Sequence, residues 1–540
     1  MVDQAVGSTS DSIEADYTER VVPGYARRSN LRMLLTFMSM QLVFGAVLVG
    51  YGARIGGLSL GDLIVAMAIA ATVMTLYCIG SANVGAVVGM THAVATRGVF
   101  GTIGSGIVSL LLVINGMGFY LFTVAFIMVI AAAVMTVYCI GSANLGAVVG
   151  MTHAVATRGV FGTIGSGIVS IMLVIDGMGF YLFTVAFIIV IATALFGTIP
   201  AVAIVTAALA FGMIVNNYFG FTGLQRFAQY VAVPVIVVWG LYATLRALTS
   251  VSAAQLAAVP AGGATVSIIF VAGGMVGLST WGNEPDIFRY ARAGRASWWN
   301  IPTLAISYFL GAFIFPIMGY LVATVASDPD QAAQIRQFAN FTTFGLAPLM
   351  MLVLLVNQWA VQDGNLYIAV NGAQNLLSRI PGYRREYTVV GLGIIAAGLT
   401  FILPDLTAIF NIVTSIGAVT VPVASTIMAM DIFVLPRVFG LHRPMHRVAA
   451  WNELAAANWP AIIALAAGTG LGAYTAGLIP VLSTDYIGFP ALQAWITGAV
   501  VYLVLVALVA RSPRVGEILG YARIGDAPPA AEPQPFSSPA

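Results

Sequence analysis

The chain has 540 residues, of which 60% are hydrophobic and only 8% are charged, and its mean hydropathy is +0.96. A soluble domain carries about 25% charged residues, so too few charges remain here to cover a water-facing surface. The formal net charge of +2 gives no reason to expect nucleic acid as a partner.

The two ends of the chain differ from its apolar middle. The first ~30 residues are polar and acidic in part, so no cleavable signal peptide is evident. The last residues are rich in Pro and Ala, a composition that does not build a packed core. We therefore expect a cytoplasmic segment at 1–32, a transmembrane domain at 33–511 and a disordered cytoplasmic tail at 512–540.

Apolar runs follow one another from residue 34 onward. A helix that spans a bilayer needs about 20 apolar residues, and lipid offers no partner for unsatisfied backbone groups. Such runs predict an all-α polytopic membrane protein; examples are 34–51, 62–80, 104–124, 301–325, 461–479 and 491–510.

One unit of the chain is repeated almost without change. Residues 73–131 recur as 134–192, with six differences over 59 aligned positions. A direct tandem copy of a helix–loop–helix unit adds two spans, so the expected total rises from about 12 to about 14. The second copy is either a functional elaboration or a recent duplication that adds two peripheral helices. The sequence does not decide which copy lies in the core.

Two residue types in the repeat carry predictions of their own. Cys78 and Cys139 are a repeat-related pair in apolar helix and indicate neither a disulfide nor a metal site. His92 and His153 border the repeated loop, and we expect both at the membrane interface rather than in a proton relay.

Arginine predicts the orientation, because the chain contains no lysine. With a cytoplasmic N-terminus, 19 Arg fall on the cytoplasmic side, and three, Arg54, Arg246 and Arg336, fall on the other. Basic residues are enriched in cytoplasmic loops. Both termini are therefore expected in the cytoplasm.

Several motifs together resemble the nucleobase:cation symporter-1 family, which comprises cytosine, purine, uracil, allantoin and hydantoin permeases. The motifs are residues 57–62 (GLSLGD), 85–101 (GAVVGMTHAVATRGVFG), 273–289 (GGMVGLSTWGNEPDIFR) and 357–367 (NQWAVQDGNLY). The resemblance extends over most of residues 30–510 and lies in the order and spacing of the motifs.

The resemblance implies a LeuT-type bundle of two inverted five-helix halves, with the first and sixth helices broken near the midplane. Residues 44–46 (Phe-Gly-Ala) and the glycines around Gly277 supply flexible backbone where the breaks are expected. Gly45 and Gly277 are thus candidate substrate-binding positions. The alternative is that these glycines only let helices pack closely.

The resemblance also implies where a heterocycle would bind. Phe119, or its copy Phe180, stands at the stacking position of the third span. In the sixth span Gly277 replaces the aromatic of the family, and Trp281, one turn on, is a candidate substitute. Gln362 aligns with a substrate-contacting amide, which can both donate and accept hydrogen bonds. The alternative for Gln362 is a hydrogen bond between helices.

The coupling ion is the last feature that the resemblance bears on. Sodium-coupled members carry two hydroxyl residues after the Trp of the eighth helix, where this chain has Ala360 and Val361. A hard cation needs oxygen ligands, so H⁺ is favoured over Na⁺. The ion-coupling candidates are Phe44, Asn357, Asp363 and Glu284. For Glu284 and its neighbour Asp286, a gate or interface contact beside Arg289 is the favoured alternative.

These features predict a secondary active transporter of the inner membrane that imports a nucleobase, cytosine or purine, with a coupled cation. The alternative is a carrier for allantoin, a hydantoin, a thiamine precursor or an amino acid. The HExxH, GxSxG and P-loop motifs are absent, so no enzyme activity, metal or cofactor is expected. The expected partners are a small heterocycle and lipid, and the expected state is a monomer.

Overall fold

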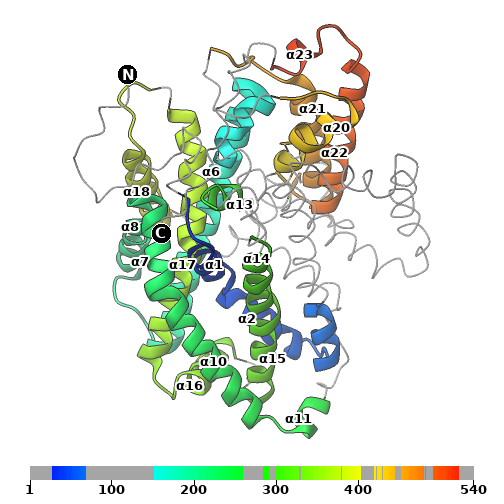
Figure 1. Ribbon diagram of the computed structural model, residues 1–540. Helices are drawn as coiled ribbons and strands as arrows, with labels where there is room; N and C mark the ends of the chain where they lie inside the picture. The colour runs from blue at the N-terminus through cyan, green and yellow to red at the C-terminus, as the bar shows by residue number, and fades with distance from the viewer. Residues whose placement is uncertain are drawn as a thin grey trace, which may run out of the picture.

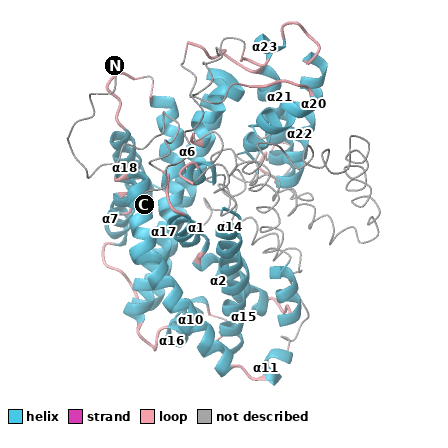
Figure 2. Ribbon diagram, in the orientation of Figure 1, coloured by secondary structure: helices cyan, strands magenta, loops and turns pink. Residues whose placement is uncertain are grey.

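The computed structural model describes residues 27–68, 151–258, 284–291, 300–326, 330–378, 380–402, 419–420, 423–428, 430–443, 452–479, 481 and 490–521. In these residues the secondary structure is helical, apart from one isolated bridge residue at Ile479 (Figures 1 and 2). The α-helices of the first half are α1 (Asn30–Gln41), α2 (Phe44–Ile55), α6 (His153–Phe196), α7 (Val202–Gly212), α8 (Val215–Tyr218), α9 (Gly220–Phe227), α10 (Val233–Ser250) and α11 (Ala253–Ala257). Those of the second half are α13 (Glu284–Phe288), α14 (Asn300–Phe309), α15 (Phe315–Val325), α16 (Gln331–Thr342), α17 (Ala347–Leu377), α18 (Arg385–Ile402), α20 (Leu435–Val438), α21 (Trp459–Thr475), α22 (Pro490–Val509) and α23 (Val515–Ile518).

Several of these helices are long and apolar enough to cross a bilayer. Within the described residues, three pass by length and composition, His153–Phe196, Gly220–Ser250 and Ala305–Val325. The number rises to five if two bent pairs each count as one span: α1 with α2, bent by 44°, and α16 with α17, bent by 95°. The chain is therefore a multi-spanning membrane protein. The total of about 14 spans stays a prediction, because many of the expected spans lie outside the described residues.

The middle helix α10 shows how a span divides between lipid and protein. Its exposed residues Val238, Leu241, Leu245 and Leu248 recur every three or four positions and form an apolar stripe. The opposite face, which includes Trp239, is buried against the bundle. An apolar exposed face is stable in contact with lipid tails but not with water, which agrees with a membrane-embedded helix.

Short π-helices precede three of the prolines. They are η3 (Ala228–Ala232), η5 (Leu310–Ile314) and η6 (Met430–Val434). In each case the following α-helix has Pro as its second residue: Pro234, Pro316 or Pro436. Proline has no N–H and its ring clashes with the carbonyl four residues earlier, and a wider π turn relieves that crowding. The spans therefore continue through their prolines.

Glycines bring the first span unusually close to α15. A Cβ atom added to Gly50 would lie 1.7 Å from the carbonyl oxygen of Pro316, and one added to Gly319 would lie 1.9 Å from that of Val47. No side chain fits at either position. Small residues at helix contacts let backbones meet in this way, so α2 and α15 pack as a tight pair.

The other tight pair is α6 with α17, which lie side by side (Figure 1). A Cβ atom at Gly177 of α6 would lie 2.5 Å from the carbonyl oxygen of Asn365, and one at Gly372 of α17 would lie 2.7 Å from that of Ser170. Residues 170 and 177 thus face residues 372 and 365, so the two helices run antiparallel. This crossing positions the side chains of α17 that are discussed below.

A glycine also breaks α6 near its start. Gly162 has φ 73° and ψ −174°, values that only glycine adopts readily. The freed amides of Thr163 and Ile164 donate to the carbonyls of residues 455 and 456, at 3.0 and 2.9 Å. Asn458 in turn donates through its side chain to the carbonyl of Val160 at 2.6 Å. Loop 455–458 therefore supplies hydrogen-bond partners for the backbone groups that the break leaves without helical partners.

The tandem repeat is described only in part. The structure describes the second copy from Met151 onward, where it forms α6 and packs against α17. All of residues 73–131, the first copy, lies outside the described residues. The domain bounds proposed from the sequence stay predictions.

Candidate functional site

The first span is broken between α1 and α2. Leu42 has φ −78° and ψ 60°, and the N–H of Val43 donates to the carbonyl of Gln41 at 2.9 Å. These are the torsions and the hydrogen bond of an inverse γ-turn. The predicted position of the break was wrong by a few residues: the helix has already resumed at Phe44, and Gly45 lies inside α2. A γ-turn with negative φ does not require glycine, which is why the glycine did not mark it.

Asn357 of α17 closes this turn from the side. Its Oδ1 accepts a hydrogen bond from the N–H of Phe44 at 2.9 Å, and its Nδ2 donates to the carbonyl of Leu42. The side chain is 1% exposed. A single amide thus satisfies one donor and one acceptor that the break removes from the helix, as buried backbone groups require. The predicted candidates Phe44 and Asn357 are brought together.

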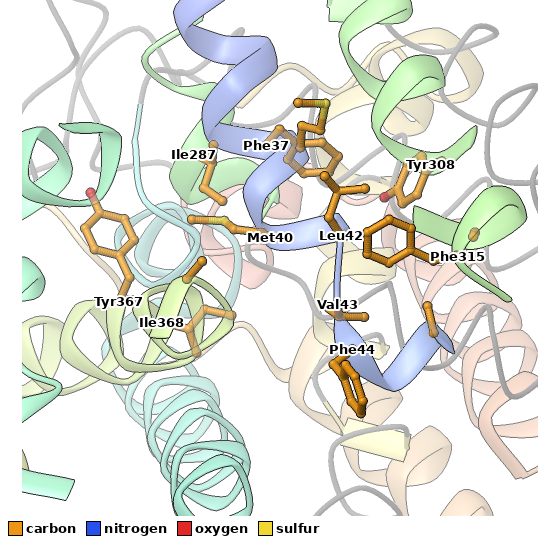
Figure 3. Packing of buried hydrophobic residues seen from close by; sticks show 14 of the residues in the cluster. Phe37, Met40, Leu42, Val43, Phe44, Ile287, Tyr308, Phe315, Tyr367 and Ile368 are labelled. Carbon is orange, nitrogen blue, oxygen red and sulfur yellow. The ribbon is translucent and has the colours of Figure 1, made fainter. Parts of the chain in front are cut away.

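Aromatic rings surround the start of α2. The ring of Phe44 lies 5.4 Å from that of Phe338, and 6.0 Å from the rings of both Phe187 and Trp239, measured between centroids. These are normal distances for interacting aromatic pairs. Figure 3 shows buried side chains of α1, α2, α13 and α17 around the break. The break is therefore enclosed by apolar packing, with the Asn357 amide as its polar contact.

One face of α6 turns toward the break. Phe187, which contacts Phe44, follows Phe180 by seven positions and Asp176 by eleven, so all three lie on one stripe of the helix. Phe180 is 7% exposed and Asp176 is 3% exposed. The predicted stacking residue Phe180 thus lies on the face directed at the broken span. Asp176 was not singled out from the sequence, although it is one of the six positions at which the repeats differ.

Gln362 lies at the contact of α17 with α6. Its Nε2 donates to the backbone carbonyl of Tyr181 at 2.7 Å, and its Oε1 accepts from Asn365 at 3.3 Å. The side chain is fully buried. Gln362 therefore makes the hydrogen bond between helices that was the alternative to substrate contact, next to Phe180 along the chain of α6.

Asp363 points to a different neighbour. Its Oδ2 accepts from the side chain of Asn216 at 2.8 Å, and its backbone carbonyl accepts from Asn217 at 3.0 Å. Both partners belong to α8. Asp363 is thus directed away from the helix face that carries Asn357, which lies six positions earlier. The structure does not bring these two ion-coupling candidates together.

The remaining candidates can be placed only in part. Glu284 is the first residue of α13, and its side chain is outside the described set. Phe119, Gly277 and Trp281 also lie outside the described residues. No group of three or more His, Cys, Asp or Glu that could hold a metal ion is found among the residues that the structure describes.

A second polar cluster joins α13 to the rest of the bundle. Asp286 accepts from the backbone N–H of His153 at 2.7 Å, and the Nε2 atom of His153 lies 2.8 Å from the hydroxyl of Ser425. Arg289 donates to the hydroxyl of Tyr367 at 2.7 Å. His153 is fully buried. Asp286 thus holds the start of α6 inside the bundle, and the expected depth of His153 at the membrane interface stays a prediction.

The segment before α1 covers the same cluster. The N–H of Arg28 donates to the carbonyl of Tyr290 at 2.8 Å, and its guanidinium donates to Thr222 at 3.0 Å. The ring of Tyr290 stacks on that of Phe221, with centroids 4.0 Å apart. Arg27 donates to the carbonyl of Ala291 at 2.8 Å. These contacts thus join the N-terminal segment to α9 and to the residues that follow α13.

Comparison with known proteins finds transporters of similar sequence. The cytosine permease of Escherichia coli (strain K12) is 27% identical over 369 residues, which cover 67% of this chain and 78% of the permease. The permease of Escherichia coli O157:H7 aligns to the same extent. No family model matches the chain.

Solved structures share the fold. Mhp1, described as a nucleobase-cation-symport-1 family transporter in a closed conformation with bromovinylhydantoin bound, matches with a TM-score of 0.59, 16% identity, and coverage of 93% of this chain and 95% of that one. The chain thus shares the fold of a nucleobase:cation symporter-1 transporter and is similar in sequence to cytosine permease, in agreement with the resemblance of its motifs. A sodium-coupled sialic acid symporter matches with a TM-score of 0.55 at 10% identity, over 92% of each chain, so the fold extends beyond nucleobase:cation symporters.

Proposed function

We propose that this chain is a secondary active transporter that imports a nucleobase, cytosine or purine, across the inner membrane together with a proton. The observation that carries the proposal is the broken first span. Asn357 stabilises its break by two hydrogen bonds, on the side of the bundle toward which the Phe180 face of α6 is directed. Broken helices beside an aromatic face suit a planar polar ligand. The similarity to cytosine permease supports the substrate class.

A hydantoin-like ring is the alternative substrate. It is favoured by the match to Mhp1 with bromovinylhydantoin bound. Hydantoins and nucleobases are both planar rings with amide edges, so one aromatic face would accept either. Allantoin, a thiamine precursor and an amino acid are further candidates.

The packing around α17 supports a proton rather than sodium as the coupled ion. Ala360 and Val361, one turn after Asn357, offer no side-chain oxygen. The carbonyl of Leu42 at the break already accepts a hydrogen bond from Asn357. A hard cation needs several free oxygen ligands to replace its water shell. Fewer oxygen ligands are therefore available to Na⁺ here than in sites that carry side-chain hydroxyls.

The arginine distribution supports cytoplasmic termini. This orientation assigns a role to the contacts of the N-terminal segment with α9 and with the residues after α13. The contacts of Arg28, Tyr290 and Asp286 would then lie on the cytoplasmic side. In that orientation we propose that these contacts form a cytoplasmic gate, which opens during import. Alternating access of this kind is the general mode of such carriers.

Purified protein in proteoliposomes tests the proposal. Uptake of radiolabelled cytosine, hypoxanthine, uracil and allantoin would be measured with an imposed pH gradient or an imposed Na⁺ gradient. We expect accumulation of cytosine or hypoxanthine that follows the pH gradient and ignores sodium. Uptake that follows sodium alone would overturn the choice of ion, and no uptake of any of these rings would overturn the substrate class.

A further inference from the structure

Asp176 is a buried acid without an evident structural task. It lies within α6, is 3% exposed, and its Oδ1 atom has no hydrogen-bond partner. Buried carboxyl groups are normally paired or hydrogen bonded, because removing a charge from water without compensation is costly. An acid within an apolar helix, with a buried carboxylate oxygen that has no hydrogen-bond partner, is a candidate for function.

The direction of Asp176 is fixed by its helix. Asp176 lies on the stripe of α6 that contains Phe180 and ends at Phe187, whose ring contacts Phe44. The adjacent residue Gly177 packs on the backbone of α17. Asp176 therefore faces the side of α6 that leads to the α1–α2 break, one turn before the aromatic at the candidate stacking position.

The repeat singles out the same residue independently. Of the six differences between the copies, five exchange one apolar residue for another, and only Asn115/Asp176 changes the charge. The copy that packs against α17 in the structure is the one with the carboxyl group. A nearly identical stretch of sequence with the isosteric amide is thus present in the same chain.

No charged neighbour explains Asp176. Asp363 of α17 bonds Asn216 instead, and Tyr367 bonds Arg289. Within the described residues, none of the other titratable groups of α6 or of the elements packed against it is bonded or ion-paired to Asp176: His153, Arg158 and Tyr181 of α6 itself, Asp286 of α13 and Arg289 just after it, Arg336 of α16, Arg385, Glu386 and Tyr387 of α18, and Tyr474 of α21. An unpaired acid in a dry site is most stable in its neutral form.

We infer that Asp176 is the residue that carries the coupled proton, an inference that rests on the proposed function. A proton adds to one carboxylate oxygen of Asp176 while the site is open to the outside. The neutral acid then tolerates the closed, water-free state. When the site opens to the cytoplasm and is hydrated, the O–H bond breaks and the proton leaves with the substrate. Asp363, which has an amide partner in α8, does not take this part.

The test is Asp176→Asn, which reproduces the residue of the first copy. Each pH unit of gradient drives about tenfold accumulation per coupled proton. We expect Asp176→Asn to lose accumulation driven by the pH gradient, while exchange of internal for external substrate continues and no longer depends on pH. Asp176→Glu should regain part of the accumulation. Asn115→Ala, at the matched position of the first copy, should accumulate like wild type.

Each outcome is informative. If Asp176→Asn accumulates substrate with an unchanged pH profile, the inference is overturned while the proposed function stands. If Asp363→Asn uncouples transport and Asp176→Asn does not, the inference is also overturned. If Asp176→Asn inserts and melts normally but loses exchange, the residue serves substrate binding and not coupling. If transport by the wild type itself does not respond to pH, the proposed proton coupling is wrong, whatever the variants of Asp176 do.

Discussion

Asn357 shows how one side chain can define a hinge. Helix breaks expose backbone groups, and in lipid those groups have no water to bond. The amide of Asn357 supplies one acceptor and one donor in the geometry that the break requires, at Phe44 and Leu42. A Ser or Thr hydroxyl would have to donate and accept from a single oxygen on a shorter side chain, and an ionised carboxylate could only accept. The residue type therefore follows from the two groups that it must satisfy.

Replacing Asn357 by Ala should destabilise the protein and stop transport. The change leaves the Phe44 N–H and the Leu42 carbonyl buried without partners, which costs about 1–3 kcal/mol. Thermal unfolding in detergent and uptake into proteoliposomes measure the two effects. Asn371→Ala is the matched control, because Asn371 is another buried Asn of α17 whose side-chain atoms have no hydrogen-bond partner. Equal melting temperatures for the two variants would contradict the hinge role.

Gln362→Ala should weaken the contact between α6 and α17. It removes the hydrogen bond to the Tyr181 carbonyl, at a cost of about 1–3 kcal/mol. Because Tyr181 follows Phe180, we also expect the substrate concentration for half-maximal uptake to rise. Uptake at several substrate concentrations, combined with thermal unfolding, measures both. A variant with lost uptake but normal thermal stability would indicate direct substrate contact instead.

At the scale of single elements, glycine decides which helices can meet. Gly50→Ala would place a methyl group 1.7 Å from the Pro316 oxygen, so α2 and α15 must separate. Overpacking of this kind costs about 1–3 kcal/mol or more. Gly52→Ala, two residues on, has no atom within 4 Å and should gain about 0.5–1 kcal/mol from helix propensity. Similar melting temperatures for the two variants would show that this contact is loose.

The elements were predictable to different degrees. Long apolar runs predicted the helices, because lipid permits little else. The position of the first break was not predictable, because it depends on Asn357, more than 300 residues away in the chain. Proline marked the positions of η3, η5 and η6 only in hindsight, since proline also ends or kinks helices.

The candidate site was predictable in its members rather than in its contacts. The family-like motif 357–367 predicted Asn357, Gln362 and Asp363 together, yet a helix directs them to different neighbours. Asp176 was visible in the sequence as a difference between the repeats. Its unpartnered state could be recognised only once α6 was placed against α17.

At the scale of the whole molecule, the repeat allows an internal experiment. Deleting 73–133 removes one repeat unit and retains Asp176. Because the sequence predicts two spans for this unit, the orientation of everything downstream should be kept. Deleting 134–194 gives a chain of the same length that retains Asn115 in its place. We expect the first deletion to transport at least as well as the full chain, and the second to exchange substrate without pH-driven accumulation. Loss of transport in a well-inserted first deletion would show that both copies are needed.

The γ-turn between α1 and α2 has a mechanical consequence. Hydrogen bonds along an intact helix resist bending, and a rigid span must lose several of them to kink. Here the helix is already interrupted, and the hydrogen bonds at the interruption are made to the side chain of Asn357 on another helix. The angle between the two half-helices can therefore change through the torsions of Leu42 and Val43 while each half stays wound. The stiffness of this joint is set by two hydrogen bonds of about 1 kcal/mol each, so thermal motion is sufficient to flex it.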